Sequence, residues 1–466
     1  MIKANKGTEL KNILFVHYGE EWIRGSERCL LDLLQHLDKT QYRPIVWCNA
    51  AVMQAHVNDL DITVIKNDFS VIFGWQAPYF DVFHYATLIN IGLKLVEKYN
   101  IDLLHANSGA PNQWLLPVAR SKKIPLLCQL HSPYLFRDRL SLGLHQSSLL
   151  VGVSHAVTKT FYDDGVDQAK VEVIHNGIDT DYLNASTVFP LREELGIPND
   201  DFLLATVGSL IHRKGVDLLL TAVKQLHDLS IPITLLIIGD GDEKKALQLQ
   251  TKTLGLCQHV FFMGECNNVQ QSLRSGVDLF VSAAREEAFG LVLAEAAQAK
   301  LAVIAPRVGG IPEVVVDQRS RPLQSELLQS ELLPTERLPT ERLPTGLLIE
   351  KENISQLVDA IHYLYSHPKQ CKEMGINGYN RVQKIFSITT NVSQFQALYK
   401  QLINKEKNVY GWRHHWLLMP IFKRFFTHSY HSLRNSKFYN LLLGYKSVVK
   451  KAVDRVIVNN GVRHDQ

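Results

Sequence analysis

Glu287 and Glu295 bracket a short apolar segment, AFGLVLA, that contains one glycine, Gly290. The residues before it, DLFVSAA, have the composition of a buried strand, so we expect a loop at REEA and a helix at FGLVLAEAAQA. Glu287 then lies just before the helix, and Glu295 lies about five residues inside it, roughly 7–8 Å further along its axis. The free N–H groups of a first helical turn favour phosphate, and a glycine lets a ligand approach the backbone.

Two carboxylates around a helix start have two explanations. A nucleotide sugar carries hydroxyl groups on both sides of its diphosphate, so helix amides could meet the phosphates while each carboxylate meets the hydroxyl groups of one side. Acidic residues also favour the first turn of a helix without binding anything, because of the helix dipole. The spacing alone does not decide between these explanations.

Three further segments place polar residues or glycines after expected strands. VGSLIHRKG puts Arg213 and Lys214 in a turn between a strand and a helix. Two cations there suit a diphosphate leaving group, whose charge grows as its bond to the sugar breaks, although a solvated Arg–Lys pair is the commoner case. IIGDG and VGGIPEVV add glycine turns at two more strand ends. All four segments map to the same edge of one sheet, where open α/β sheets bind ligands.

Short apolar runs alternate with segments of helical period along most of the chain, and the series occurs twice. Near-continuous apolar strands separated by helices indicate a parallel sheet covered on both faces. We therefore predict an α/β fold of two Rossmann-like, doubly wound parallel-sheet domains that face a cleft, plus a basic aromatic C-terminal tail. The expected strands are 12–18, 43–48, 101–106, 124–131, 149–154 and 171–176 in the first series, and 202–208, 233–241, 259–265, 278–284 and 301–306 in the second.

The domain limits follow from these two series and from the polar, proline-containing segment NASTVFPLREELGIPND between them, which we expect to be a hinge. Residues 323–347 are five copies of a five-residue unit whose three prolines exclude a continuous helix, and a surface loop expanded by duplication is favoured over a binding motif. The predicted units are an acceptor-side domain at 1–188, a donor domain at 189–388 with the repeat insert at 322–346, a closing helix at 389–406 that returns toward the first domain, and the tail at 407–466.

The composition is that of a globular protein, with 46% hydrophobic and 21% charged residues. Six cysteines show no CxxC or CxH spacing, which argues against a zinc ribbon or a disulfide framework and suits a reducing compartment. No signal peptide and no run long enough to span a membrane are visible. We therefore expect a cytoplasmic protein.

Positive charge is concentrated in the tail. The net charge is +4, but residues 407–466 hold eleven Lys or Arg and two Asp, so the rest of the chain carries −5. The body therefore gives no sign of nucleic-acid binding. Aromatic residues interleave with the basic ones in the tail, which suits peripheral binding to an anionic membrane face. A helical appendage packed on the first domain is the alternative.

Taken together and in this order, four segments resemble the donor domain of the family-4 retaining glycosyltransferases, which have the glycosyltransferase-B fold: VGSLIHRKG (207–215), IIGDG (237–241), EEAFGLVLAEA (286–296) and VGGIPEVV (308–315). The resemblance covers about residues 12–403 and includes HNGID at 175–179. It implies a retaining, metal-independent reaction with no cofactor beyond a nucleotide-sugar donor as co-substrate.

The resemblance also implies roles for residues of the donor domain. Arg213 and Lys214 would hold the donor diphosphate. Glu287 would be catalytic and contact the hydroxyl groups of the transferred sugar, whereas Glu295 would bind the ribose. The backbone amides that would lie near the sugar and phosphates are those of Phe289, Gly290 and Leu291.

In the first domain, WIRGSER resembles the family's glycine-rich loop that closes over the diphosphate. Gly25 is present there for donor binding, but Arg24 replaces its usual glycine partner. His131 in QLHSPY matches a histidine that faces the sugar and is the second catalytic candidate. His105 matches another common position, although its strand context favours burial. Asn107, at a strand end, is an acceptor-side candidate.

We predict a hexosyltransferase-type glycosyltransferase of polysaccharide biosynthesis that uses a nucleotide-sugar donor and a glycan or lipid-linked acceptor. A nucleotide-sugar epimerase or a glycan phosphorylase of related fold is the alternative enzyme, but the phosphorylase needs a pyridoxal-phosphate lysine site that we do not find. A non-catalytic sugar-nucleotide-binding scaffold is the other alternative. Arg24 supports the scaffold, as does Ser209, which stands where many relatives carry arginine, while the intact carboxylates and the Arg–Lys pair argue against it.

Overall fold

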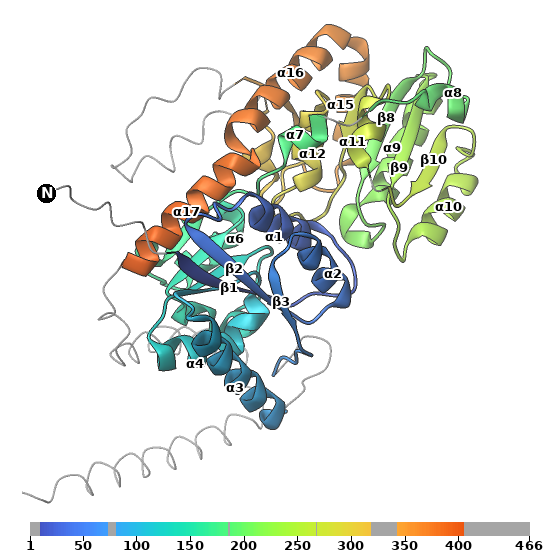
Figure 1. Cartoon of the computed structure of the whole chain (residues 1–466). Coiled ribbons are helices and arrows are strands. Elements are labelled where there is room, and N and C mark those ends of the chain that lie inside the picture. The colour runs from blue at the N-terminus through green and yellow to red at the C-terminus, as the bar shows by residue number, and fades with distance from the viewer. Residues whose placement is uncertain (1–9, 73–80, 185–186, 267, 318–342, 405–466) are drawn as a thin grey trace, which may run out of the picture. The chain divides into compact units, whose positions relative to one another are not determined.

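The computed structural model describes residues 10–72, 81–184, 187–266, 268–317 and 343–404 (Figure 1). Its strands form two sheets, one of seven strands with the order β3-β2-β1-β4-β5-β6-β7 and one of six with the order β10-β9-β8-β11-β12-β13. Every pair of neighbouring strands is parallel. In each sheet the order reverses beside the first strand, which is the switch point of a doubly wound sheet and the usual place for a ligand.

The elements of the two sheets are as follows. The first sheet and its helices comprise β1 Lys11–His17, α1 Gly25–His36, β2 Tyr42–Cys48, α2 Ala51–Asp59, β3 Thr63–Lys66, α3 Val82–Tyr99, β4 Leu103–Ala106, α4 Gly109–Lys122, β5 Leu126–Leu130, α5 Phe136–Ser141, β6 Leu149–Gly152, α6 His155–Asp163, β7 Val171–Val173 and α7 Thr180–Asn184. The second comprises α8 Leu191–Leu195, β8 Phe202–Val207, α9 Val216–Asp228, β9 Ile233–Ile238, α10 Lys244–Thr253, β10 Val260–Gly264, α11 Val269–Arg274, β11 Leu279–Val281, α12 Leu291–Gln298, β12 Ala302–Pro306, α13 Ile311–Val314, β13 Gly346–Ile349, α15 Ile354–Ser366 and α16 Pro368–Ile385.

Both faces of each sheet are covered, which explains the continuous apolar strands. In β1, Ile13 and Phe15 belong to one buried cluster with residues of α1 and α2, while Leu14 and Val16 belong to another with residues of α3 and α4. In the second sheet, Leu204 packs with residues of α9 and α15 on one face. Burial on both faces leaves the strand ends as the only edges where polar side chains can gather.

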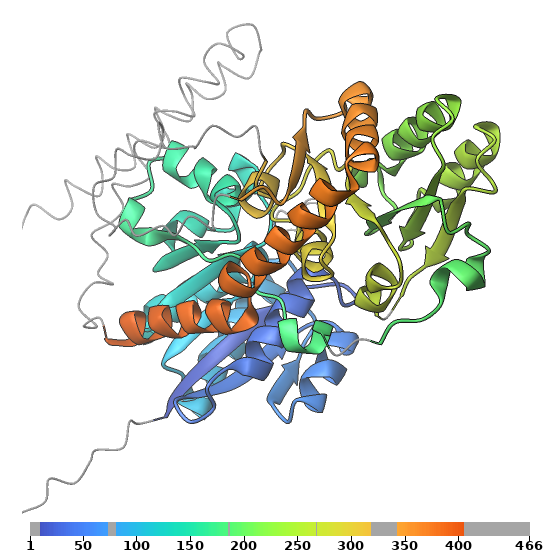
Figure 2. The same ribbon diagram turned by 90° about the horizontal axis from the view of Figure 1, so that it is seen from above.

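The last helix of the described chain, α17 (Ile388–Asn404), packs on α1 and β4 of the first sheet. Figure 2 shows it in orange and red as the direct continuation of α16, which packs on β12 of the second sheet. Tyr399 of α17 has no exposed surface, and its hydroxyl lies 2.8 Å from Nδ1 of the buried His105. The chain therefore returns from the second sheet to the first through these two helices.

The expected fold class and all eleven expected strands are confirmed, and two strands were not expected. β3 is short and half-exposed, so its sequence lacks an apolar run. β13 includes the end of the last repeat copy, LPTGL, and pairs with β12. The expectation of a surface loop is wrong for this copy because Leu347 is buried, and the other four copies lie outside the described residues.

Among the helices of the described residues, none combines the length and the hydropathy that a membrane crossing requires. The tail at 407–466 lies outside the described residues. Its proposed binding to a membrane therefore stays a prediction, as do the domain limits.

Candidate active site

Glu287 and Lys214 form an ion pair at the carboxyl edge of the second sheet. Glu287 lies in the loop after β11, and Lys214 ends a short 3-10 turn between β8 and α9. These loops adjoin because β8 and β11 are neighbours in the sheet. Lys214 Nζ lies 2.6 Å from Glu287 Oε2, and the two side chains are only 17% and 15% exposed. The structure thus brings together two residues whose sequence positions are 73 apart.

Arg213 occupies the same turn but points into more open surroundings. One of its guanidinium nitrogens donates to the backbone oxygen of Glu286 at 2.9 Å and lies 4.0 Å from Glu287 Oε2. Its side chain is 43% exposed. Charge on Lys214 is therefore compensated at short range by Glu287, whereas the Arg213 guanidinium has an open side that can meet an anion.

Three glycines let the backbone of this loop pack tightly. Gly290 precedes α12 with a φ of 101°, a conformation that other residues rarely adopt. A Cβ on Gly309 would lie 1.7 Å from the backbone oxygen of Glu287. Gly310 N–H donates to that same oxygen at 3.1 Å. The diglycine turn of VGGIPE therefore fixes the backbone of Glu287 beside the start of α12.

Arg285, which sequence reasoning did not single out, holds the Arg213–Lys214 turn from behind. Its guanidinium binds both carboxylate oxygens of Asp217 at 2.8 and 2.7 Å, and it also donates to the backbone oxygen of His212 at 2.7 Å. The Arg285 backbone N–H donates to the oxygen of Arg213 at 2.8 Å. A bidentate guanidinium between a turn and the first residues of α9 fixes the direction in which the two cations point.

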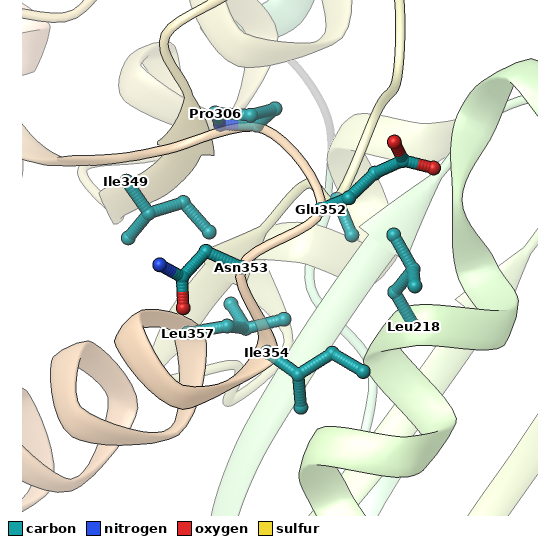
Figure 3. A pocket seen from close by; sticks show the side chains of 8 residues that line it. Leu218, Pro306, Ile349, Glu352, Asn353, Ile354 and Leu357 are labelled. Carbon is teal, nitrogen blue, oxygen red and sulfur yellow. The ribbon is translucent and has the colours of Figure 1, made fainter.

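Figure 3 shows a small hollow next to this support, and Glu352 is among the residues that line it. Its volume is about 10 Å³, which is room for one water molecule and not for a nucleotide. The other labelled lining residues are mostly apolar: Leu218, Pro306, Ile349, Asn353, Ile354 and Leu357. Glu352 lies 2.6 Å from Arg285 Nε, so its carboxylate completes the support of the turn.

Arg285→Lys is expected to weaken nucleoside-diphosphate binding by about tenfold, because an ammonium group keeps the charge but cannot bind Asp217 with a planar fork. Isothermal titration calorimetry with a nucleoside diphosphate measures the affinity. Arg192→Lys is the matched control, since Arg192 is similarly bound to Asp278 and to backbone oxygens at the opposite edge of the sheet. Equal affinity of the Arg285 variant and the parent protein would contradict the supporting role.

Glu295 lies on α12 where that helix meets α1. Gly25 at the start of α1 is close to the same place, since a Cβ there would lie 3.4 Å from Leu291 Cδ1. Desolvation by burial is the main cause that raises the pKa of Glu295 to about 7; Arg28 lowers this pKa and Asp32 raises it. Burial likewise raises the pKa of Asp32 to about 6. The structure thus gathers Gly25, Leu291 and Glu295, all assigned to donor binding, and adds Arg28 and Asp32.

The raised pKa of Glu295 predicts how stability depends on pH. Between its unfolded value near 4.5 and about 7, the folded protein holds a proton that the unfolded chain has released, so this group's contribution to stability falls as pH rises. Glu295→Gln removes that contribution. The melting temperature of the variant minus that of the parent is therefore expected to increase from pH 5 to pH 8. A difference that stays constant over this range would contradict the assignment.

The first-domain candidates take different positions. His131 follows β5, is half-buried, and its pKa is lowered to about 4, mainly by desolvation. His131 Nε2 lies 3.1 Å from Oδ1 of Asn107, which is fully buried. Asn107 therefore reaches the site only through His131, and its acceptor-side role stays a prediction. His105 is fully buried as expected, and burial lowers its pKa to about 3.

Phe289 contributes to this region through its backbone. Its side chain is 2% exposed, and its ring centroid lies 5.7 Å from that of His175 and 5.5 Å from that of Phe386. Only its main-chain amide is therefore placed for the role that the resemblance implies. Leu291 begins α12, so its amide is one of the free N–H groups of the first turn.

Two contacts that the sequence did not predict join the halves of the described chain beside this loop. Ser154 Oγ donates to the backbone oxygen of Ala288 at 2.6 Å. Glu313 of the VGGIPE segment accepts from the backbone N–H of His155 at 3.0 Å and lies 2.8 Å from Nε2 of His175. A carboxylate at the N-terminus of α6 is stabilised by the helix dipole and the free N–H groups there. Glu313 thus connects the diglycine turn to α6.

Within the described ranges, no group of three His, Cys, Asp or Glu residues is placed to hold a metal ion. The functional residues that sequence reasoning missed are Arg285 and Glu313, and also His17 and Glu27, whose contacts are described below. Glu313 could have been identified from the sequence, because it is the acidic residue of the VGGIPE segment. His17 is the last residue of a strand, just as His131 follows one, and this position at a strand end could have identified His17 as a candidate.

Comparison with known families assigns both halves of the chain. The family model described as "Glycosyl transferases group 1" matches residues 189–381, and the one described as "Glycosyltransferase Family 4" matches residues 23–182. N-acetyl-alpha-D-glucosaminyl L-malate synthase of Bacillus anthracis is 23% identical over 356 residues, which are 74% of this chain and 84% of that protein. Several other relatives match over only 35–42% of their own length.

Two solved structures share the fold. A glycosyltransferase from Rickettsia africae ESF-5 superposes with a TM-score of 0.70 at 19% identity, covering 85% of this chain and 100% of that one. Anabaena Alr3699/HepE in complex with UDP superposes with a TM-score of 0.67 at 21% identity, covering 84% and 100%. The same Anabaena protein has also been solved with UDP-glucose.

Proposed function

This chain belongs to the family-4 glycosyltransferases of the glycosyltransferase-B fold, and from that premise we propose that it transfers a sugar from a nucleotide-sugar donor to a glycan or lipid-linked acceptor. The observation that carries the proposal is the Lys214–Glu287 pair at the start of α12. A cation for phosphate, a carboxylate for sugar hydroxyl groups and free helix amides stand there within one hydrogen-bonded unit.

The proposed reaction retains the configuration of the sugar and uses no metal ion. The bond from the anomeric carbon to the diphosphate oxygen breaks, the acceptor oxygen attacks from the same face, and its proton passes to the leaving diphosphate. Arg213 and Lys214 stabilise the charge that grows on that diphosphate. Glu287 holds the sugar hydroxyl groups and thereby orients the anomeric carbon.

Uridine diphosphate sugars are the first donors to test, because the structurally similar Anabaena protein was solved with UDP and with UDP-glucose. Incubation with a panel of nucleotide sugars and measurement of the released nucleotide would identify the donor. Addition of EDTA tests the metal independence, and NMR of the product gives its anomeric configuration. Nucleotide binding without any release from the whole panel, with or without acceptor glycans, would favour a non-catalytic scaffold.

Peripheral membrane binding is proposed for the tail alone. Its eleven Lys or Arg residues and two Asp residues suit an anionic surface. In flotation with vesicles that contain anionic lipid, we expect the whole chain to rise with the vesicles and a chain that ends at residue 406 to stay behind. Equal partitioning of the two chains would refute this proposal.

A further inference from the structure

A continuous chain of buried hydrogen bonds runs from the loop before α1 to His131. Its members are Glu27, His17 and Asn107, which are 4%, 1% and 0% exposed. Glu27 is in the first turn of α1, His17 ends β1 and Asn107 follows β4, so three separate elements supply one line of polar side chains. Buried polar groups are retained where each has a partner, and here each has at least two.

The direction of every bond in this chain follows from Asn107. Its Nδ2 lies 3.2 Å from the backbone oxygen of Ser26, which can only accept, so Nδ2 is the donor end and Oδ1 the acceptor end. Nδ2 also lies 2.9 Å from His17 Nδ1, which must therefore be unprotonated. Oδ1 lies 3.1 Å from His131 Nε2, which must therefore carry a proton.

The other end of the chain fits the same directions. His17 Nε2, the protonated nitrogen of a neutral ring whose Nδ1 accepts, lies 3.1 Å from Glu27 Oε1. Glu27 Oε2 accepts from the backbone N–H of Arg24 at 3.1 Å. Burial raises the pKa of Glu27, whereas its hydrogen bonds to His17 and to the backbone of Arg24 lower it below its usual value. Glu27 is therefore an ionised acceptor for both donors.

The backbone of Gly19 covers the hydrogen bond between His17 and Glu27. A Cβ on Gly19 would lie 2.5 Å from His17 Nε2 and 3.0 Å from Glu27 Oε1, so the backbone passes directly over that hydrogen bond. The loop that contains Gly19 is held in place, because Asn49 binds both the N–H and the oxygen of Gly19 at 3.0 and 2.8 Å. His17 is buried and hydrogen-bonded at both ring nitrogens, which holds its ring in one orientation.

We propose that Glu27, His17 and Asn107 are positioning residues that join the Arg24–Gly25 loop to His131 and present His131 as its Nε2–H tautomer, with Nδ1 as a hydrogen-bond acceptor for a substrate hydroxyl group. Among the described residues, Nδ1 of His131 has no hydrogen-bond partner. The substrate part of this inference rests on the proposed function. The tautomer part does not, since it concerns the protein without ligand.

Two nearly isosteric variants separate the links of the chain. In Glu27→Gln, the amide oxygen satisfies Arg24 N–H and the amide nitrogen faces His17 Nε2. His17 must then accept at Nε2 and carry its proton on Nδ1, where it meets another donor, Nδ2 of Asn107. In Asn107→Asp, the oxygen that binds His131 is kept, but His17 gains a second carboxylate and takes up a proton.

The experiment is NMR of the whole chain with 15N-labelled histidine, in which the imidazole nitrogen shifts report the tautomer. The parent protein is expected to show His131 as Nε2–H. Glu27→Gln is expected to mix the His131 tautomers, although Glu27 does not touch that residue, and Asn107→Asp is expected to keep the Nε2–H form and to turn His17 into imidazolium. Loss of a signal in His131→Gln assigns it.

Asn112→Asp is the matched control. Asn112 is also a buried asparagine beside the first sheet, but it binds Leu142 O and Ser147 and takes no part in the hydrogen bonds that lead to His131. Its His17 and His131 signals are expected to equal those of the parent. Unchanged His131 signals in Glu27→Gln, or a parent His131 in the Nδ1–H form, would overturn the proposal. Should Glu27→Gln fail to fold, the parent protein and Asn107→Asp still decide it, because a neutral His17 in Asn107→Asp would also overturn the proposal.

Kinetics distinguish this inference from the proposed function. Glu27→Gln is expected to lower kcat with the identified donor by about tenfold while the donor KM changes less, because a misoriented imidazole affects the transition state more than binding. A changed His131 tautomer with an unchanged kcat would support the positioning role of the buried hydrogen bonds but would show that His131 takes no part in the reaction. If the parent protein shows the expected tautomers but no turnover, the proposed function is refuted, while the positioning of His131 by Glu27, His17 and Asn107 is still supported.

Discussion

Glu287→Ala is expected to lower kcat for sugar transfer by about 10²- to 10³-fold at saturating donor, because a carboxylate that orients the sugar acts mainly in the transition state. The protein is expected to stay folded. Lys214 loses its partner at 2.6 Å but is long enough to turn its ammonium group to solvent. Initial rates with the identified donor measure the first effect, and circular dichroism on heating measures the second.

Glu286→Ala is the matched control for this prediction. Glu286 is the neighbouring residue, its side chain is exposed, and its backbone oxygen, which binds Arg213, is kept in the variant. Its kcat is expected to stay within about twofold of the parent, as for most exposed residues. Transfer rates of the Glu287 variant equal to those of the parent would remove Glu287 from the site.

Periodicity and composition predicted most of this fold for a physical reason. A parallel sheet that is covered on both faces needs uninterrupted apolar strands, and these are visible in a single sequence. β3 escaped prediction because it is short and half-exposed and therefore carries no apolar run. β13 escaped because its first residues belong to a repeat whose prolines indicate loop, although Leu347 and Leu348 complete a buried edge of the sheet.

The site was predictable to the level of which strand ends carry chemistry. Lys214 and Glu287 follow β8 and β11, and both strand ends were identified, but their contact depends on β8 and β11 being neighbours, which the order along the chain does not reveal. The role of Arg285 could not be predicted from the sequence for another reason. An arginine in a loop is ordinarily solvated, and only the folded positions of Asp217 and Glu352 make it a support.

The buried line from Glu27 to His131 shows the same limit in the first sheet. Its members come from three elements, and the direction of each bond is set by one backbone oxygen, that of Ser26. Asn107 was singled out by its strand end and assigned to the acceptor side. Its complete burial instead places it between two histidines, which only the packing of α1 on the sheet could establish.

Lys214→Ala is expected to weaken nucleoside-diphosphate binding by at least about tenfold, whereas Glu287→Gln is expected to strengthen it or leave it unchanged. The two residues pair in the protein without ligand, so a diphosphate has to compete with Glu287 for the ammonium group. Removing the cation takes away the phosphate's partner, while neutralising the carboxylate removes its competitor and one repulsive charge. Calorimetry with the nucleoside diphosphate that the donor panel identifies measures both affinities.

Weaker binding in Lys214→Ala without weaker binding in Glu287→Gln is the specific result, since general damage to the site would weaken binding in both. Arg213→Ala is the control, and it is expected to weaken binding less than Lys214→Ala because Arg213 is 43% exposed and solvent screens its charge. For sugar transfer, we expect the double variant Lys214→Ala/Glu287→Ala to lose less kcat than the product of the two single losses. Residues that act as one unit behave in this way. A loss of binding in Glu287→Gln as large as that in Lys214→Ala would show that the carboxylate contacts the nucleotide itself, not the sugar.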